Sequence, residues 1–153
     1  MKFSITQNGE ELSKEKYNWD ENTKTLSTNE NNLVLNFSKY NGVIFKTGDY
    51  CTFNTGSNCI FNTDSNCIFD TGSFCTFDTG SFCTFACGEK CVCIRRDIYE
   101  VIEIPENKTI KLNEYGVKGY SFQLQKRKIV IDGKEIEMSE ESYQNLKESL
   151  INP

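Results

Sequence analysis

The sequence contains no histidine among its 153 residues. This absence excludes Ser-His-Asp and Cys-His catalysis and any histidine ligand to a metal. Basic side chains are also in the minority, with 17 lysines and arginines against 22 aspartates and glutamates, which argues against recognition of nucleic acid through a basic surface. No apolar run approaches the roughly 18 residues typical of a membrane-spanning helix. We therefore expect a protein that binds neither nucleic acid nor membrane.

The first residues also lack the apolar stretch that a signal peptide has. Met1 to Leu12 is polar and acidic, so we expect no secretion signal and a cytoplasmic location. Cysteines are kept reduced in that compartment. We therefore expect most of the eight cysteines to be free thiols rather than a disulfide framework.

The dominant feature of the sequence is an internal repeat of eight residues, C-x-F-[ND]-T-[GD]-S-x, whose positions we number 1 to 8. Cysteine recurs at every eighth residue, and phenylalanine follows two places after the first five of these cysteines. The repeated residues are Cys51, Cys59, Cys67, Cys75, Cys83 and Cys91, with Phe53, Phe61, Phe69, Phe77 and Phe85. Weaker copies begin at Leu35, with Phe37 at position 3, and at Val43. The repeat thus covers residues 35–98.

Each unit predicts one short strand followed by a corner. Positions 1 and 3 lie on the same face of a strand, so Cys and Phe point inward while positions 2 and 4 point outward. The Thr-Gly-Ser that follows is typical of a turn, in which Gly permits a positive φ. Two units make a flattened coil of about 16 residues with a strand on each side. The sequence therefore predicts a mostly β fold, a parallel two-sided β-solenoid in which residues i and i+16 stack.

The flanking segments lack the repeat, and we expect them to cover the open ends of the solenoid, where unpaired strands would otherwise pair with other chains. The N-terminal cap comprises residues 1–34 and the C-terminal cap residues 99–153. Within the C-terminal cap, Asp132-Gly133 predicts a β-hairpin. Ser139 predicts the start of a short helix over residues 140–150, with Tyr143, Leu146 and Leu150 on one stripe.

A resemblance to a known group of proteins follows from these motifs. The array C-x-F-[ND]-T-G-S-x, followed by Cys-Val-Cys-Ile-Arg-Arg-Asp and Lys118-Gly-Tyr120, resembles the octapeptide-repeat proteins of bacteriophages, large viruses and bacteria. The resemblance implies a solenoid and a phage or viral origin, which would place the protein in a host cytoplasm or a virion. Those proteins are mostly uncharacterised, so the resemblance implies no activity and no functional residue.

Two copies of Asp-Thr-Gly-Ser, at Asp70 and Asp78, match the motif of aspartic proteases. That chemistry needs two carboxylates about 3 Å apart that share a proton. In a two-sided coil, residues eight apart fall on opposite sheets and face away from each other, and the repeat by itself accounts for both tetrapeptides. We therefore expect no protease, no other enzyme and no catalytic residue.

The cysteines that end the repeat, Cys83, Cys87, Cys91 and Cys93, are the candidates for a metal site. Zinc favours four thiolates, usually in two close pairs separated by a longer loop. Three of the four fall on inward positions, where a small thiol packs well, and only Cys87 stands at position 5, where other units have Thr. Core thiols, a local disulfide that includes Cys87, and a zinc site all remain open. We favour core thiols and expect no cofactor.

Four residues are our candidates for contact with another protein. Phe74 and Phe82 stand at position 8, where alternation predicts that they do not point into the core, and Ile60 and Ile68 stand at the outward position 2. Exposed apolar groups of this kind mark interaction surfaces.

The functional expectation is a non-enzymatic, rigid scaffold for protein–protein interaction that forms a homo-oligomer. In a phage or viral context it would be a structural or assembly component or an inhibitor of a host protein. The alternative is a module that binds a small ligand or a metal at the Cys83–Cys93 end.

Overall fold

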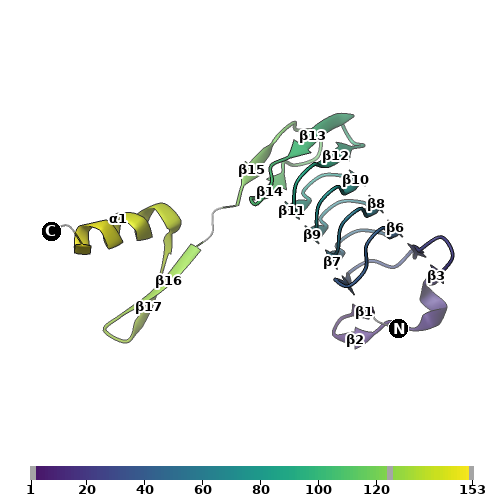
Figure 1. The fold of residues 1–153 in the computed structure, drawn as a ribbon, viewed down its shortest axis with the longest axis horizontal. Helices are drawn as coiled ribbons and strands as arrows, with labels where there is room; N and C mark the ends of the chain where they lie inside the picture. The colour runs from purple at the N-terminus through teal and green to yellow at the C-terminus, as the bar shows by residue number, and fades with distance from the viewer. Residues whose placement is uncertain (1–2, 124–125, 152–153) are drawn as a thin grey trace. The chain divides into compact units, whose positions relative to one another are not determined.

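The computed structural model describes residues 3–123 and 126–151. The chain divides into two units, residues 1–122 and residues 123–153, which we call the solenoid unit and the C-terminal unit (Figure 1). In the described residues, no helix is long and apolar enough to cross a membrane.

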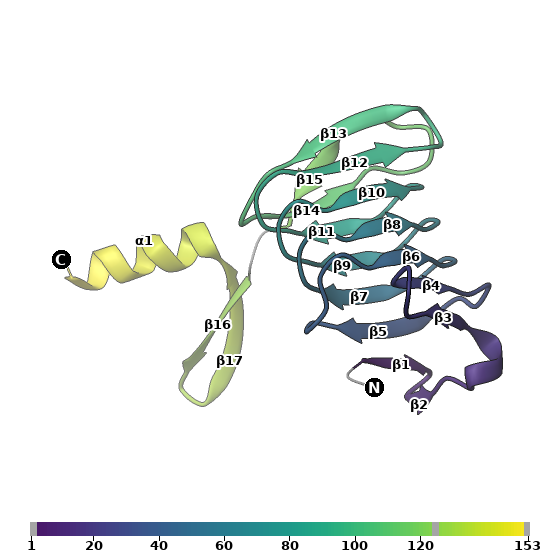
Figure 2. The ribbon, with the colours of Figure 1, turned by 45° about the vertical axis from the view of Figure 1, so that its right-hand side comes forward.

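The solenoid unit is built from two sheets whose strands alternate along the chain (Figure 2). Sheet A has the order β15-β14-β11-β9-β7-β5-β1-β2 and sheet B the order β13-β12-β10-β8-β6-β4-β3. The strands of the repeat are β5 (Leu33–Phe37), β6 (Ile44–Lys46), β7 (Thr52–Thr55), β8 (Ile60–Asn62), β9 (Ile68–Asp70), β10 (Thr76–Thr79), β11 (Thr84–Ala86) and β12 (Cys91–Arg95). Neighbouring repeat strands are parallel, which confirms the predicted mostly β, two-sided solenoid of about four turns.

The register gives the length of a coil. Residues sixteen apart pair through most of the repeat, as Phe53 does with Phe69. At the N-terminal end the coil is longer, because Leu35 rather than Phe37 pairs with Phe53. The prediction that Phe37 occupies position 3 is therefore wrong, and Phe37 pairs with Thr55 at position 5. The corner after β5 is two residues longer than the later ones, which shifts the register of the first copy.

Aromatic rings form the centre of the core. The rings at position 3 stack face to face on the ring one coil away, with centroids 4.8–5.0 Å apart, and edge to face on the ring from the opposite sheet. The stacked rings are Phe45, Phe53, Phe61, Phe69, Phe77 and Phe85. Such pairs each stabilise a core by about 0.5–1.5 kcal/mol beyond their area burial, so the two ladders tie every coil to its neighbours.

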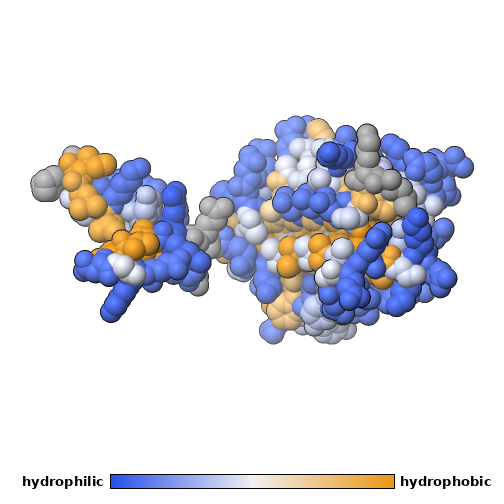
Figure 3. Space-filling model, turned by 90° about the horizontal axis from the view of Figure 1, so that it is seen from below, coloured by the Kyte–Doolittle hydropathy of each residue, from blue (hydrophilic) through white to orange (hydrophobic). Residues whose placement is uncertain are grey.

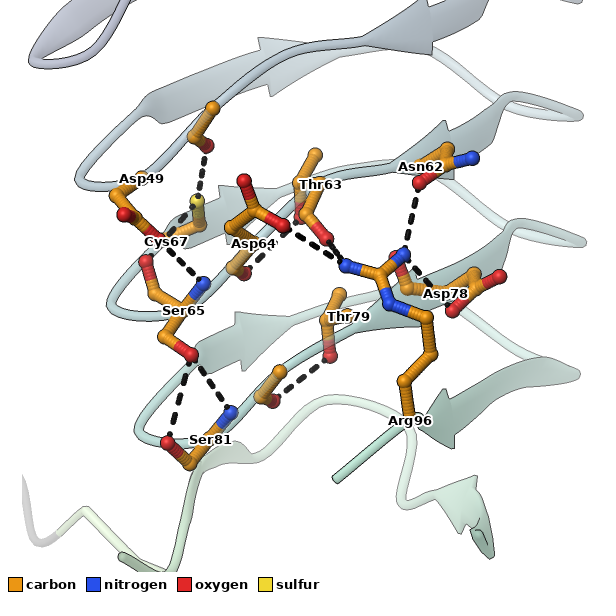
Figure 4. A network of polar contacts seen from close by, with 12 residues as sticks. Asp49, Asn62, Thr63, Asp64, Ser65, Cys67, Asp78, Thr79, Ser81 and Arg96 are labelled. Atoms are coloured by element: carbon orange, nitrogen blue, oxygen red, sulfur yellow. Dashed lines mark hydrogen bonds and ion pairs between the residues drawn. The ribbon is translucent and has the colours of Figure 1, made fainter. Parts of the chain in front are cut away.

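The left-handed residue of each corner is not the one that the sequence predicted. The glycines of the Thr-Gly-Ser corners do not have a positive φ, whereas position 8 does in every complete unit, with φ of 56–69°. The position 8 residues are Gly42, Tyr50, Asn58, Asn66, Phe74, Phe82 and Lys90. Crowding favours glycine at most position 6 sites, since a Cβ on Gly80 would collide with Ser65 Oγ of the coil before. One unit has Asp64 there instead. Ser65 Oγ also accepts a hydrogen bond from the N–H of Ser81 at 3.1 Å (Figure 4).

Antiparallel strands close both ends of the solenoid unit. Sheet A continues into β1 (Ser4–Gln7) and β2 (Glu10–Glu11) at one end and into β14 (Thr109–Leu112) and β15 (Tyr120–Phe122) at the other. Sheet B continues into β4 (Thr25–Ser27), which is parallel to β6, and then β3 (Asn18–Asp20), and at the other end into β13 (Glu100–Ile104). A 3-10 helix, η1 (Lys14–Lys16), lies between β2 and β3 along the chain.

A buried arginine that the sequence analysis did not single out holds the C-terminal end. Arg95 has no exposed surface, and its guanidinium lies 2.6 Å from the carboxylate of Asp97. It also donates to the backbone carbonyls of Glu114, at 3.1 Å, and Val117. Burial alone would raise the pKa of Asp97, but the hydrogen bonds from Arg95 and from the N–H of Gly116 outweigh burial and lower it. The carboxylate and guanidinium thus anchor the loop that leads into β15.

The C-terminal unit is a hairpin followed by a helix, as the sequence predicts. β16 (Lys126–Ile131) and β17 (Lys134–Ser139) are antiparallel, and Asp132 and Gly133 between them both have a positive φ. The helix α1 spans Glu140–Ile151, and the Ser139 hydroxyl caps it by accepting a hydrogen bond from the N–H of Ser142 at 3.1 Å. None of the described residues of this unit is buried, so the unit has no core of its own within that range.

Candidate functional site

The outward residues at position 2 form one continuous row on each sheet. On sheet B the row is Ile44, Ile60, Thr76 and Val92, which pair in register. On sheet A the row is Val34, Thr52, Ile68 and Thr84. Neither row contains a charged residue. Ile60 and Ile68 are 49% and 50% exposed, but because they lie on opposite sheets they cannot belong to one contact surface.

Apolar surface extends further on sheet B than on sheet A. The neighbouring outward row of sheet B ends in Ile94, which pairs with Val101 of β13, and both side chains are exposed. Ile94 and Val92 belong to the same strand, so the two rows meet at this end. Figure 3 shows the opposite side of the solenoid unit, on which β7 and β9 of sheet A lie in Figure 1, and there too hydrophobic residues form a band between hydrophilic ones. We call Ile44, Ile60, Val92, Ile94 and Val101 the sheet B patch.

Arg96 neutralises the acidic side chains beside the sheet B patch. Its guanidinium lies 3.1 Å from the carboxylate of Asp78 and 3.0 Å from that of Asp64, and it donates to the side-chain oxygen of Asn62 at 2.8 Å (Figure 4). It also donates to the carbonyl of Thr63. One arginine therefore spans two coils, and the outer face of sheet B carries little unpaired charge at this point.

The two Asp-Thr-Gly-Ser copies do not form a catalytic pair. Asp70 lies in β9 of sheet A and Asp78 in β10 of sheet B, and each carboxylate faces outward. The Asp78 carboxylate is engaged by Arg96. A shared proton between the two carboxylates is excluded by this separation.

Phe74 and Phe82 project from opposite corners of the solenoid. Phe74 precedes a strand of sheet B and Phe82 a strand of sheet A, and they are 48% and 40% exposed. The Lys111 amine lies 5.6 Å from the centroid of the Phe82 ring. Tyr50, which the sequence analysis missed, occupies the same corner as Phe82 two coils earlier and is also exposed. Its place at position 8 was the signal that could have identified it.

All eight cysteines are buried and free, and they form two rows rather than a cluster. Cys51, Cys67 and Cys83 lead into strands of sheet A, and Cys59, Cys75 and Cys91 lead into strands of sheet B. Cys93 pairs with Phe77 at position 3, and Cys87 occupies the inward position 5. The four cysteines of the proposed metal candidate thus belong to different rows. In the described residues, no group of three or more Cys, Asp or Glu is arranged to hold a metal ion.

Burial keeps most of the inward thiols protonated. It raises the pKa of Cys93 to about 12. The pKa of Cys59 is raised first by the hydrogen bond that its thiol shares with Cys75 and second by burial. Several thiols also donate to the position 6 carbonyl of the coil before, as Cys67 does to Gly48 and Cys91 to Gly72, both at 3.5 Å. The thiolate rather than the thiol is the nucleophile and the metal ligand, so these thiols must lose a proton before they react.

The cavities of the described residues are shallow recesses near the C-terminal end of the solenoid unit. Three of them have volumes of about 430, 350 and 440 Å³. Phe82 and Val117 lie in the first, Cys87 and Lys108 in the second, and Cys91 and Glu103 in the third.

Comparison with known proteins gives no relative for this chain. No family model, no curated protein and no solved structure matches it.

Proposed function

We propose that the solenoid unit is a non-enzymatic scaffold that binds another protein through the sheet B patch. The observation that carries the proposal is this patch, in which exposed Ile60, Ile94 and Val101 lie on the outer face of sheet B. The patch is interrupted by Thr76, which stands between Ile60 and Val92, and it is bordered by the exposed Glu103. Exposed apolar residues that gather on one face are typical of protein interfaces.

The rigidity of the face supports the same proposal. The backbone of each outward row is hydrogen-bonded to the coils on both sides, and the aromatic ladders lie directly beneath it. A surface that is already ordered loses little conformational entropy when a partner binds. The side chains of the patch are short and branched, so they too lose little freedom.

Catalysis is a weaker hypothesis for the same residues. The recesses are shallow, the carboxylates of Asp70 and Asp78 lie on opposite sheets, and the thiols of Cys59 and Cys93 have raised pKa values. A small-ligand or metal module at the Cys83–Cys93 end is also weaker, because Cys83 and Cys91 belong to different rows.

We take a second copy of the chain as the first partner to test, because identical faces can meet about a two-fold axis, the commonest symmetry of soluble oligomers. The resemblance to octapeptide-repeat proteins of phages and large viruses extends the proposal to a virion or assembly component, or to an inhibitor of a host protein, located in the host cytoplasm or the virion.

The test uses two substitutions at the same position of the repeat on opposite faces. Light scattering measures the mass of the wild type, Ile60→Asp and Ile68→Asp at tens of micromolar protein. We expect an oligomeric wild type, a monomeric Ile60→Asp and an Ile68→Asp that stays oligomeric. A monomeric wild type rejects self-association, and an oligomer that only Ile68→Asp disrupts moves the contact to sheet A.

A further inference from the structure

The corner between Cys87 and Cys91 differs chemically from every other corner of the repeat. In five other units a Thr at position 5 and the Cys at position 1 of the next unit stand on either side of the same corner. The pairs are Thr47 and Cys51, Thr55 and Cys59, Thr63 and Cys67, Thr71 and Cys75, and Thr79 and Cys83. At the last corner Cys87 replaces the Thr, so the fold brings two thiols together where the other corners hold one thiol and one hydroxyl.

The two thiols belong to one corner. Cys87 and Cys91 lie four residues apart along the chain, on either side of the corner, and both side chains are buried. Disulfides join residues whose side chains already meet at short range, and the corner supplies that arrangement for Cys87 and Cys91 without a rearrangement of strands.

Packing does not account for the cysteine at position 87. Four of the five Thr residues at position 5 donate a hydrogen bond to the next carbonyl, as Thr71 does to Gly72 and Thr79 to Gly80, both at 3.2 Å. The exception is Thr47, whose buried hydroxyl has no partner in the described residues. Within the described residues the Cys87 thiol makes no such bond. A Thr would therefore serve the corner better, and what the cysteine adds is the reactivity of its sulfur.

Cys87 is also the cysteine with the best access from solvent. It is 5% exposed, whereas each of the other seven is 1% exposed or less. It lies in a recess of about 350 Å³ that Lys108 and Asn107 also line. A recess of this size admits a small molecule.

From these observations we infer that Cys87 and Cys91 form a redox-active dithiol that a low-molecular-weight disulfide, such as oxidised glutathione, converts into an intramolecular disulfide.

The thiol–disulfide exchange takes place in two steps, in which atoms and electrons balance. The Cys87 thiolate attacks one sulfur of the small disulfide, which forms a mixed disulfide and releases one small thiolate. The Cys91 thiolate then attacks the Cys87 sulfur and releases the second small thiolate. The protein loses two electrons and two protons, and the small disulfide is reduced to two thiols. Cys91 is buried beside Cys87, so the second step occurs inside the solenoid.

The experiment exposes the folded full-length protein to oxidised and reduced glutathione in graded ratios, quenches with acid and alkylates the remaining thiols. We expect the eight alkylated thiols of the reduced protein to fall to six, with an intact mass lower by two hydrogens before alkylation. Trypsin cleaves after Lys90, so the peptide that ends there stays joined to the one that begins at Cys91. Fragmentation of the joined peptides identifies Cys87 and Cys91 as the linked pair.

Two variants use residues that the repeat itself carries at these positions. Cys87→Thr has the Thr of the other corners, and Cys91→Val has the Val that Val43 places at position 1. Both are expected to stay folded and to keep all seven remaining thiols reduced, while Cys75→Val still forms the disulfide. Eight thiols that persist at the most oxidising ratio overturn the inference. So does a stable glutathione adduct without ring closure, or a disulfide between Cys75 and Cys91.

Discussion

Position 8 of the repeat has a left-handed backbone in every complete unit, yet it holds Gly, Asn, Lys, Tyr or Phe. Asn at positions 58 and 66 suits this conformation, because its short polar side chain tolerates a positive φ. Phe74 and Phe82 do not, since a bulky side chain is strained there. Strain of this kind persists where the surrounding structure enforces it and accompanies functional positions, which makes these two rings secondary candidates for contact.

Replacement of Phe74 by Asn tests whether the ring is kept at a cost in stability. Sparsely populated backbone conformations cost about 1–3 kcal/mol, and Asn relieves part of this, so we expect Phe74→Asn to raise the free energy of unfolding by up to about 1 kcal/mol. Urea denaturation measures the difference. The matched control is Asn58→Phe, in the same corner one coil earlier, which should lower the stability by a similar amount. A Phe74→Asn variant that is less stable than the wild type contradicts this account.

Glycine at position 6 avoids a steric clash with the coil before, and the backbone conformation there does not require it. A Cβ at Gly80 would collide with Ser65 Oγ, and its other neighbours are ordinary contacts 3.4 Å away. We expect Gly80→Ala to lose about 1–3 kcal/mol of stability, as overpacking does. The loss should shrink in the Ser65→Ala background, because the colliding atom is gone. Additive losses in the double-mutant cycle, measured by chemical denaturation, would contradict this explanation.

At the scale of elements, the C-terminal end of the solenoid depends on one buried arginine. Arg95 occupies position 5 of the last unit, where five other units have Thr and the unit before has Cys87. It pairs with Asp97 and, at 3.8 Å, with Glu100, and it donates to two carbonyls of the loop before β15. A buried charge that loses its partner is strongly destabilising, so this end of the fold depends on the carboxylate.

The stability of that end should depend on pH through Asp97. Because its pKa is lowered in the folded protein, the carboxylate stabilises the fold above the pKa of an unfolded aspartate, about 3.9. This stabilisation is lost as the pH falls through the lowered folded value. We expect Asp97→Asn to lose about 1.5–3 kcal/mol at pH 7, the range for hydrogen bonds to a charged group, because Glu100 remains 3.8 Å from the Arg95 guanidinium.

Denaturation of Asp97→Asn and wild type between pH 3 and 7 measures this dependence, and the difference between the two curves should shrink by up to about 1 kcal/mol at the acidic end. The control is Asp64→Asn, which removes the exposed partner of Arg96 and should change the stability by less than about 1 kcal/mol. Parallel curves for Asp97→Asn and wild type would show that the carboxylate does not titrate as described.

At the scale of the whole molecule, the two units differ in what stabilises them. The solenoid unit has a continuous core from Ile5 to Leu112, whereas no described residue of the C-terminal unit is buried. A hairpin and a helix of this size without a core are marginal in water. The scaffold function proposed for the sheet B patch therefore rests on the solenoid unit.

Truncation after Phe122 tests the independence of that unit. We expect residues 1–122 to unfold cooperatively within a few degrees of the full-length melting temperature, because the core lies within this range. Circular dichroism during thermal unfolding measures the transition, and light scattering of the truncated chain gives its mass. A melting temperature lower by more than about 10 °C would correspond to a loss of over 1 kcal/mol and would contradict independence.

The sequence by itself determined the architecture of the repeat, the hairpin and the helix. A strict eight-residue period with inward Cys and Phe leaves few alternatives, because side-chain alternation and turn residues repeat in phase. The tertiary structure decided what depends on neighbouring coils. The separation of Ile60 from Ile68 follows from the predicted two-sided coil, in which successive units lie in opposite sheets, and the structure confirms it. Only the tertiary structure placed Phe37 opposite Thr55 and buried Arg95 beside Asp97. The structure also explains the position 6 glycines by steric crowding. The atom that a Cβ on Gly80 would collide with, Ser65 Oγ, belongs to the coil before, fifteen residues earlier.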